Sequence, residues 1–131
     1  MDPRLCNGTS LAYLGDAVLE LLVRCHLLNS GLQNTGTLNA QAAQFVRATA
    51  QSDAAERILP LLCEEELEYF KRGRNASGIS APKSATTAQY RRATGLEALF
   101  GYLYLTNQTQ RMQDLFALAF PITQSSEPSH T

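Results

Sequence analysis

An apolar pattern of helical period runs through nearly the whole length of this chain. From Leu11 to Leu28, apolar residues recur at spacings of three and four, which is the signature of an amphipathic α-helix. Thr9 or Ser10 is a candidate cap at the start of this helix, and the Asn-Ser-Gly sequence at 29–31 is a candidate end. No segment shows convincing strand character and no internal repeat is visible. The pattern predicts an all-α fold.

The same period predicts further helices along the chain. They are expected from about residue 37, from a cap at Ser52-Asp53 onward, over Glu64–Lys71, from Ser84 or Thr86 to Thr106, and over Thr109–Phe120. Glycines and a proline between 72 and 83 predict a loop there, and Pro60 predicts a helix break or a first turn. Pro121 ends the last helix. We expect one domain over residues 1–121 and a disordered polar tail over 122–131.

The N-terminus lacks the basic start and apolar run of a signal peptide, and no apolar stretch is long enough to span a bilayer. We therefore expect a cytoplasmic protein without a membrane partner. The cysteines at 6, 25 and 63 are isolated, and Cys25 falls in the apolar helical pattern, which predicts a core position. The two histidines lie far apart, so zinc or Cys–His chemistry is poorly supported.

The charge is unevenly distributed. The formal net charge is only −1, yet no Asp or Glu occurs from Lys71 to Leu96, and that stretch holds six of the 11 basic residues. An acidic cluster, 64–68, immediately precedes it. Such segregation creates a local positive field in a near-neutral protein. By itself, such a stretch is also typical of an ordinary solvated basic loop.

Two carboxylates interrupt otherwise apolar helices. Asp16 follows Gly15, and Glu97 lies between Gly95 and Gly101. A glycine within a helix costs about 1 kcal/mol relative to alanine, so these glycines indicate close packing or the close approach of another backbone. A carboxylate in an apolar helix must be paired, hydrogen-bonded or bound to a metal.

A simpler interpretation of these carboxylates stays open. Asp16, Glu20 and Arg24 follow one another at four-residue spacing and could form an ion-paired, solvent-facing stripe. Glu97 could pair with the arginine at 91 or at 92. Spacing alone does not show that Asp16 and Glu97 meet in space.

Three strings carry a resemblance to a known family. The segment Leu14–Leu21 (LGDAVLEL) resembles the signature helix of the ribonuclease III family, and Gly95–Gly101 (GLEALFG) resembles its second metal-ligand helix. Arg72–Ala76 (RGRNA), followed by Pro82-Lys83 and Tyr90-Arg91, resembles the compact Mini-ribonuclease III subfamily. The three matches occur in the family's order and cover about residues 9–120.

The resemblance implies a homodimeric, all-α helical bundle like the ribonuclease III endonuclease domain, with active sites in a valley formed across the dimer. Asp16 and Glu97 would be the catalytic metal ligands for Mg²⁺, with Mn²⁺ as a substitute. The implied activity is cleavage of double-stranded RNA to leave 5′-phosphate and 3′-hydroxyl ends. The compact subfamily further implies maturation of precursor large-subunit (23S) ribosomal RNA, with a ribosomal protein as a helper, and no double-stranded-RNA-binding domain.

The chain departs from the larger enzymes at two positions. Those enzymes have a Glu four residues before the signature Asp and an Asp three residues before the second Glu, where this chain has Ala12 and Thr94. The compact subfamily resembles this chain in its reduced set. Thr94, Glu20 and water are candidates to complete the metal shell, because Mg²⁺ prefers six oxygen ligands and retains several waters.

The basic stretch and the following helix supply candidate RNA contacts. These are Arg72, Arg74, Asn75, Lys83, Tyr90 and Arg91, with Lys71 as a further phosphate contact. A-form RNA is recognised largely through its shape, phosphates and 2′-hydroxyls, which suits such residues. Two alternatives remain beside the nuclease: a catalytically silent RNA-binding or ribosome-assembly module on the same fold, and a plain helical interaction protein.

Overall fold

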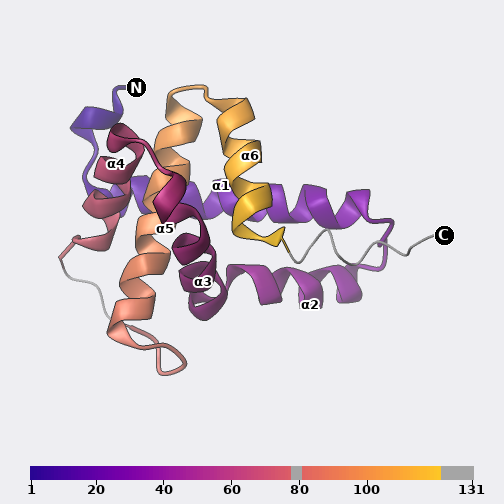
Figure 1. Ribbon diagram of the computed structural model, residues 1–131. Coiled ribbons are helices and arrows are strands. Elements are labelled where there is room, and N and C mark those ends of the chain that lie inside the picture. The colour runs from indigo at the N-terminus through magenta and orange to yellow at the C-terminus, as the bar shows by residue number, and fades with distance from the viewer. Residues whose placement is uncertain (78–80, 122–131) are drawn as a thin grey trace.

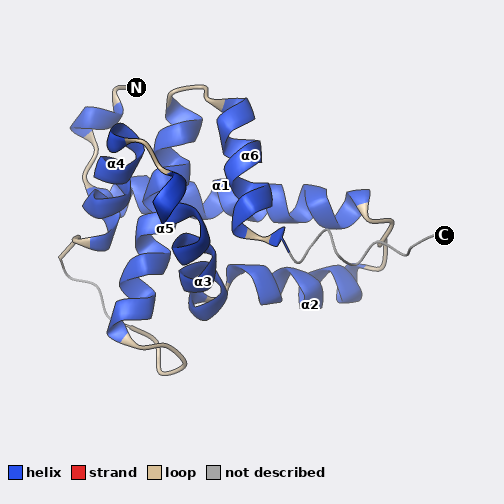
Figure 2. Cartoon of the chain, in the orientation of Figure 1, coloured by secondary structure: helices blue, strands red, loops and turns tan. Residues whose placement is uncertain are grey.

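The computed structural model describes residues 1–77 and 81–121, which form a bundle of α-helices with two short 3-10 helices (Figures 1 and 2). The elements in chain order are η1 (Pro3–Leu5), α1 (Gly8–Asn29), α2 (Thr35–Val46), α3 (Ala48–Ile58), η2 (Leu59–Leu61), α4 (Glu64–Arg74), α5 (Thr87–Leu105) and α6 (Thr109–Ala119). No strand occurs in the described ranges, and the predicted all-α fold is confirmed.

Helices α1 and α5 form the centre of the bundle, where α5 crosses α1 (Figure 1). Leu11 and Leu19 of α1, and Leu96 and Leu99 of α5, are almost completely buried. The predicted close packing at the glycines is confirmed. A Cβ atom on Gly15 would overlap the backbone carbonyl of Glu97.

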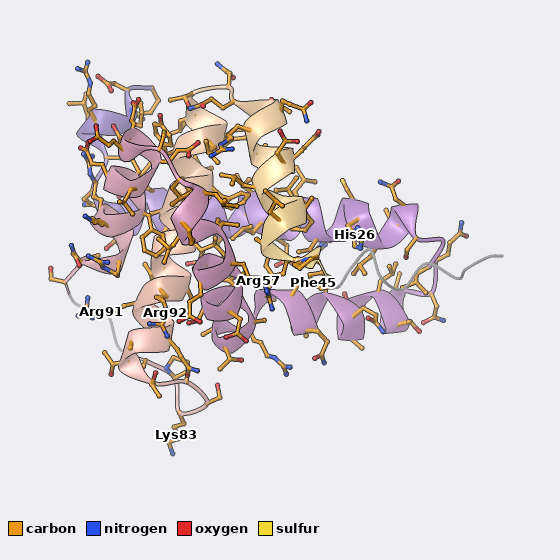
Figure 3. The ribbon with its side chains drawn as sticks, viewed as in Figure 1. His26, Phe45, Arg57, Lys83, Arg91 and Arg92 are labelled. Carbon is orange, nitrogen blue, oxygen red and sulfur yellow. The ribbon has the colours of Figure 1, made fainter. Side chains whose placement is uncertain are left out.

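The other helices surround this pair. Helix α2 packs against α1, α3 and α4 pack against α5, and α6 packs against both α3 and α5 (Figure 1). Where α1, α2 and α6 meet, the His26 ring lies 6.0 Å from the Phe45 ring and 6.4 Å from the Phe116 ring, measured between centroids. Figure 3 shows His26 and Phe45 at this junction. His26 therefore packs with aromatic rings.

Several predicted helix ends are corrected. Asn7, not Thr9 or Ser10, caps α1, because its side-chain oxygen accepts from the Ser10 backbone N–H at 2.8 Å. The predicted cap at Ser52-Asp53 is wrong, since both residues lie inside α3, where Ser52 is buried. Of the two starts expected for α5, Ser84 and Thr86, the structure has Thr86, which caps the helix and forms a capping box with Gln89.

The predicted loop over 72–83 begins too early. Helix α4 continues to Arg74, and Gly73 lies within it, because the missing side chain lets α4 approach the Thr94 carbonyl of α5 closely. The Arg91 side chain donates to the Arg74 and Ala76 carbonyls at 3.0 and 2.9 Å. These bonds satisfy carbonyls at the end of α4 that have no partner within the helix.

Cys25 is exposed, so its predicted core position is wrong. Helix α1 carries apolar residues on two faces, and Cys25 lies on the outward one, where Tyr13, Leu21 and Leu28 are 85%, 59% and 57% exposed. No helix in the described ranges is long and apolar enough to cross a bilayer. The predicted disordered tail, 122–131, lies outside the described residues.

Candidate active site

The crossing of α1 and α5 brings Asp16 and Glu97 together. Gly15 contacts the backbone of α5 at Glu97 itself, so the residue after Gly15 is placed beside the Glu97 side chain. The two carboxyl groups share a hydrogen bond. The meeting of these carboxylates, which the sequence pattern alone left open, is therefore present in the structure.

The Glu97 carboxyl titrates abnormally. Burial is the largest cause, followed by the neighbouring Asp16 charge and the hydrogen bond to Asp16, and together they raise the pKa of Glu97 to about 8. A hydrogen bond from Gln51 acts in the opposite direction. Without a cation, a proton shared with Asp16 relieves the repulsion near neutral pH.

Both carboxylates open onto a groove of about 290 Å³. It is lined by Thr9, Ala12, Tyr13, Asp16, Tyr90, Thr94 and Glu97, and we call it the carboxylate groove. Thr9 and Tyr13 were not among the predicted site residues. They lie about one turn before Ala12 and Asp16 on α1, and helical spacing is the signal that could have found them.

The simpler interpretation of the carboxylates holds in part. Glu20 pairs with Arg24 at 3.1 Å, as the spacing predicted, and Glu20 does not line the carboxylate groove. Neither Arg91 nor Arg92 forms the ion pair with Glu97 that this interpretation allowed. Arg91 donates to backbone carbonyls, and Arg92 donates to Ser52 at 2.9 Å and lies 3.8 Å from Glu56.

Gln51 is a further residue that contacts the site. It lies in α3, is only 2% exposed, and its side chain hydrogen-bonds Glu97. Its seven-residue spacing to buried Ile58 places it on the inner face of α3. This spacing is visible in the sequence, but the predicted helix start at Ser52-Asp53 left Gln51 outside the helix.

The donor set suits a hard divalent cation. Two carboxylates converge and repel each other, and a cation can take the place of the shared proton. The Thr94 hydroxyl lines the same groove, where it donates to the Tyr90 carbonyl at 2.9 Å and keeps lone pairs free. Within residues 1–77 and 81–121, no cluster of three or more His, Cys, Asp or Glu side chains forms a metal site.

The predicted RNA-contacting residues fall into two groups. Lys71, Asn75 and Lys83 are exposed, and Figure 3 shows Lys83 extending from the loop away from the helices. Arg74 is half-buried beside Asn75, to which its Nε donates at 3.2 Å. Tyr90 is also half-buried and lines the carboxylate groove.

The second group comprises Arg72 and Arg91, whose guanidinium groups already have protein partners. Arg72 donates to Glu68 and to the Cys6 carbonyl, both at 3.1 Å, and its guanidinium lies 4.5 Å from the Tyr69 ring centroid. Arg72 thereby joins the N-terminal segment to α4. Arg91 similarly holds the beginning of the loop against α5.

Comparison with known proteins identifies the class to which this fold and site belong. Residues 9–108 match the Ribonuclease III domain, and the chain belongs to the ribonuclease III family. Enzymes of this family use divalent metal ions.

Relatives of this chain within the family include proteins named Mini-ribonuclease 3. The one from Desulfitobacterium hafniense is 52% identical over 81% of this chain and 67% of its own length. That from Symbiobacterium thermophilum is 46% identical over 90% of this chain and 91% of its own length. A crystal structure of a Fusobacterium nucleatum protein, 33% identical, superposes with a TM-score of 0.83 over 92% of this chain and 99% of that one.

Proposed function

We propose that this chain is a divalent-cation-dependent endoribonuclease that cleaves double-stranded RNA, with Asp16 and Glu97 as its catalytic metal ligands. The observation that carries the proposal is the convergence of these two carboxylates from α1 and α5 in one open groove. Membership of the ribonuclease III family and similarity to Mini-ribonuclease 3 proteins support a ribonuclease.

The proposed cation is Mg²⁺, with Mn²⁺ as a substitute. When bound, such a cation activates water and offsets the charge on the attacked phosphate. Asp16 and Glu97 would hold it through their oxygens, and the Thr94 hydroxyl, which lines the same groove, would contribute a further oxygen. Glu20 is less suited, because Arg24 already holds its carboxylate away from the groove. The products proposed are 5′-phosphate and 3′-hydroxyl ends.

The proposed RNA-contacting surface extends from the C-terminal end of α4 and the residues just before α5 to the carboxylate groove. Lys83, Lys71 and Asn75 have exposed side chains, and Arg74 adjoins Asn75. Tyr90 continues this surface into the groove. We assign Arg72 and Arg91 to shaping the surface, since their donors already meet backbone carbonyls of this chain.

We also propose that the functional unit is a homodimer formed through the outward face of α1. Tyr13, Leu21 and Leu28 are among the large apolar residues exposed in the described ranges, and they lie along one side of this helix. Burying such a stripe against a second copy would remove apolar area from water. Tyr13 also lines the carboxylate groove, so the groove would open at the dimer seam.

The cellular role we propose is maturation of precursor large-subunit (23S) ribosomal RNA in the cytoplasm, with a ribosomal protein as a helper. Similarity to the Mini-ribonuclease 3 proteins supports this role. The alternative is a catalytically silent RNA-binding or ribosome-assembly module. Ala12 and Thr94 favour it, because both line the groove and neither offers a carboxylate.

Cleavage of a long, perfectly paired RNA with Mg²⁺ tests the proposal. Wild type should cut, whereas Asp16→Asn, Glu97→Gln and wild type with EDTA should not. Glu20→Gln is the matched control, because Glu20 is an acid one turn from Asp16 that pairs with Arg24 outside the groove. Cutting by Asp16→Asn would refute the ligand assignment. RNA binding without cutting by wild type would favour the silent module.

A further inference from the structure

Helix α3 buries two adjacent polar side chains against α5. Gln51 is 2% exposed and Ser52 is 1% exposed, while their neighbours on the inner face, Ala54, Ala55 and Ile58, are apolar and buried. A buried amide or hydroxyl without a hydrogen bond destabilises the fold. Each of these two residues should therefore have a specific partner.

Their partners differ. The Ser52 hydroxyl accepts a hydrogen bond from the Arg92 Nε at 2.9 Å, outside the carboxylate groove. Gln51 is buried where α3 packs on α5, the helix that carries Glu97, and the Glu97 carboxyl is the group to which its amide bonds. Of this adjacent pair, Gln51 contacts a site carboxylate directly, and Ser52 supports the same helix without contacting it.

The chemistry of a primary amide suits this position. Its NH₂ group donates to a carboxylate, and the amide does not itself titrate or compete for the cation as a third acid would. A carboxylate has two oxygens, so a donor on one leaves the other free. Groups that orient metal-binding side chains in this way typically change metal affinity or activity by about 10–100-fold when they are removed.

We propose that Gln51 is a positioning residue of the carboxylate groove, whose buried side-chain amide donates to Glu97 and holds that carboxylate beside Asp16 for a divalent cation. The inference rests on the proposed function for the identity of the metal ligands. It adds a third helix, α3, to the two that carry the carboxylates.

The test measures Mn²⁺ binding to the full chain by calorimetry without RNA, together with Mn²⁺ titrations of RNA cleavage. Gln51→Met keeps the side-chain length and removes the donor, and Ser52→Ala is the matched control. We expect Gln51→Met to weaken Mn²⁺ binding about 10–100-fold and to shift the cleavage titration equally. Ser52→Ala should keep the wild-type Mn²⁺ affinity despite its lost hydrogen bond, and Glu97→Gln should abolish binding.

Mn²⁺ affinity of folded Gln51→Met within twofold of wild type would overturn the proposal, as would equal weakening by Ser52→Ala or no Mn²⁺ binding by wild type. If Gln51→Met does not fold, Gln51→Asn decides, because its shorter amide stays polar but withdraws from Glu97. Its affinity must then fall while its circular dichroism stays native. Wild type that binds Mn²⁺ in a Gln51-dependent way but never cuts RNA would refute the nuclease and support the role of Gln51.

Discussion

Replacing Gly15 with alanine tests the helix crossing on which the carboxylate groove depends. Alanine is favoured over glycine within a helix by about 1 kcal/mol, so an isolated α1 would gain stability. In the bundle, however, the new Cβ would overlap the Glu97 backbone carbonyl. A backbone atom cannot turn aside as a side chain can, so α5 must move away from α1.

The balance of these effects sets the expected magnitude. Overpacking of a well-packed core costs typically about 1–3 kcal/mol, and the contact here is with backbone, which places Gly15→Ala at the upper end. After subtraction of the helix-propensity gain, we expect a net loss of about 2 kcal/mol in the free energy of unfolding. The separation should also draw Asp16 away from Glu97, which weakens the Asp16 contribution to the raised Glu97 pKa.

Urea unfolding followed by far-ultraviolet circular dichroism measures this loss. With a slope of roughly 1.5–2 kcal/mol per molar urea, the midpoint should fall by about 1 M. Gly36→Ala in α2 is the control, because the nearest atom to its new Cβ is the Asn34 side-chain oxygen at 3.2 Å. Protein concentration is held constant, since dimerisation would shift apparent stability. Gly15→Ala with wild-type or higher stability would refute the close crossing.

In metal-free protein the pKa of Glu97 is raised from 4.5 to about 8. The free energy of unfolding should therefore decline as pH rises across that interval, because the folded state binds the proton more tightly than the unfolded state. Urea midpoints measured with EDTA should show this decline in wild type and not in Glu97→Gln. The pKa of Glu66 is instead lowered, mainly by its hydrogen bond with Arg111. Its stabilisation should therefore be present above 4.5 and lost as pH falls through the lowered value. Glu66→Ala should lower the free energy of unfolding by about 2 kcal/mol at pH 7, because Arg111 loses this partner but stays partly exposed and keeps its bond to the Leu61 carbonyl. Arg91→Ala should accelerate amide hydrogen exchange at the end of α4, because Arg91 donates to carbonyls there. Lys83→Ala should leave this exchange unchanged but should reduce the number of ions released on RNA binding, read from the salt dependence of affinity, by about one. Identical exchange in both variants would contradict the role assigned to Arg91.

The sequence carries the class of fold because helical period and capping are local properties. The apolar spacing along α1 predicts a helix from residues a few positions apart, and the structure closes the start of α5 with the equally local Thr86–Gln89 capping box. Predictions failed where a local signal competed with distant packing. Ser52 resembles a helix cap in isolation, but Arg92 of α5 supplies its partner. Gly73 resembles a loop residue, but it allows α4 to contact α5.

The candidate site likewise combines features that the local sequence indicates with contacts that only the packing of distant helices creates. The local pattern establishes that Asp16 and Glu97 need partners, because a carboxylate in an apolar helix is costly unless it is paired or bound. The packing of the helices makes each of them the other's neighbour, brings Gln51 to Glu97, and lets Arg91 hold the beginning of the loop. Sequence spacing specifies the face of a helix on which a side chain lies. The crossing of α1 and α5, set by the close contact at Gly15, specifies what that face meets.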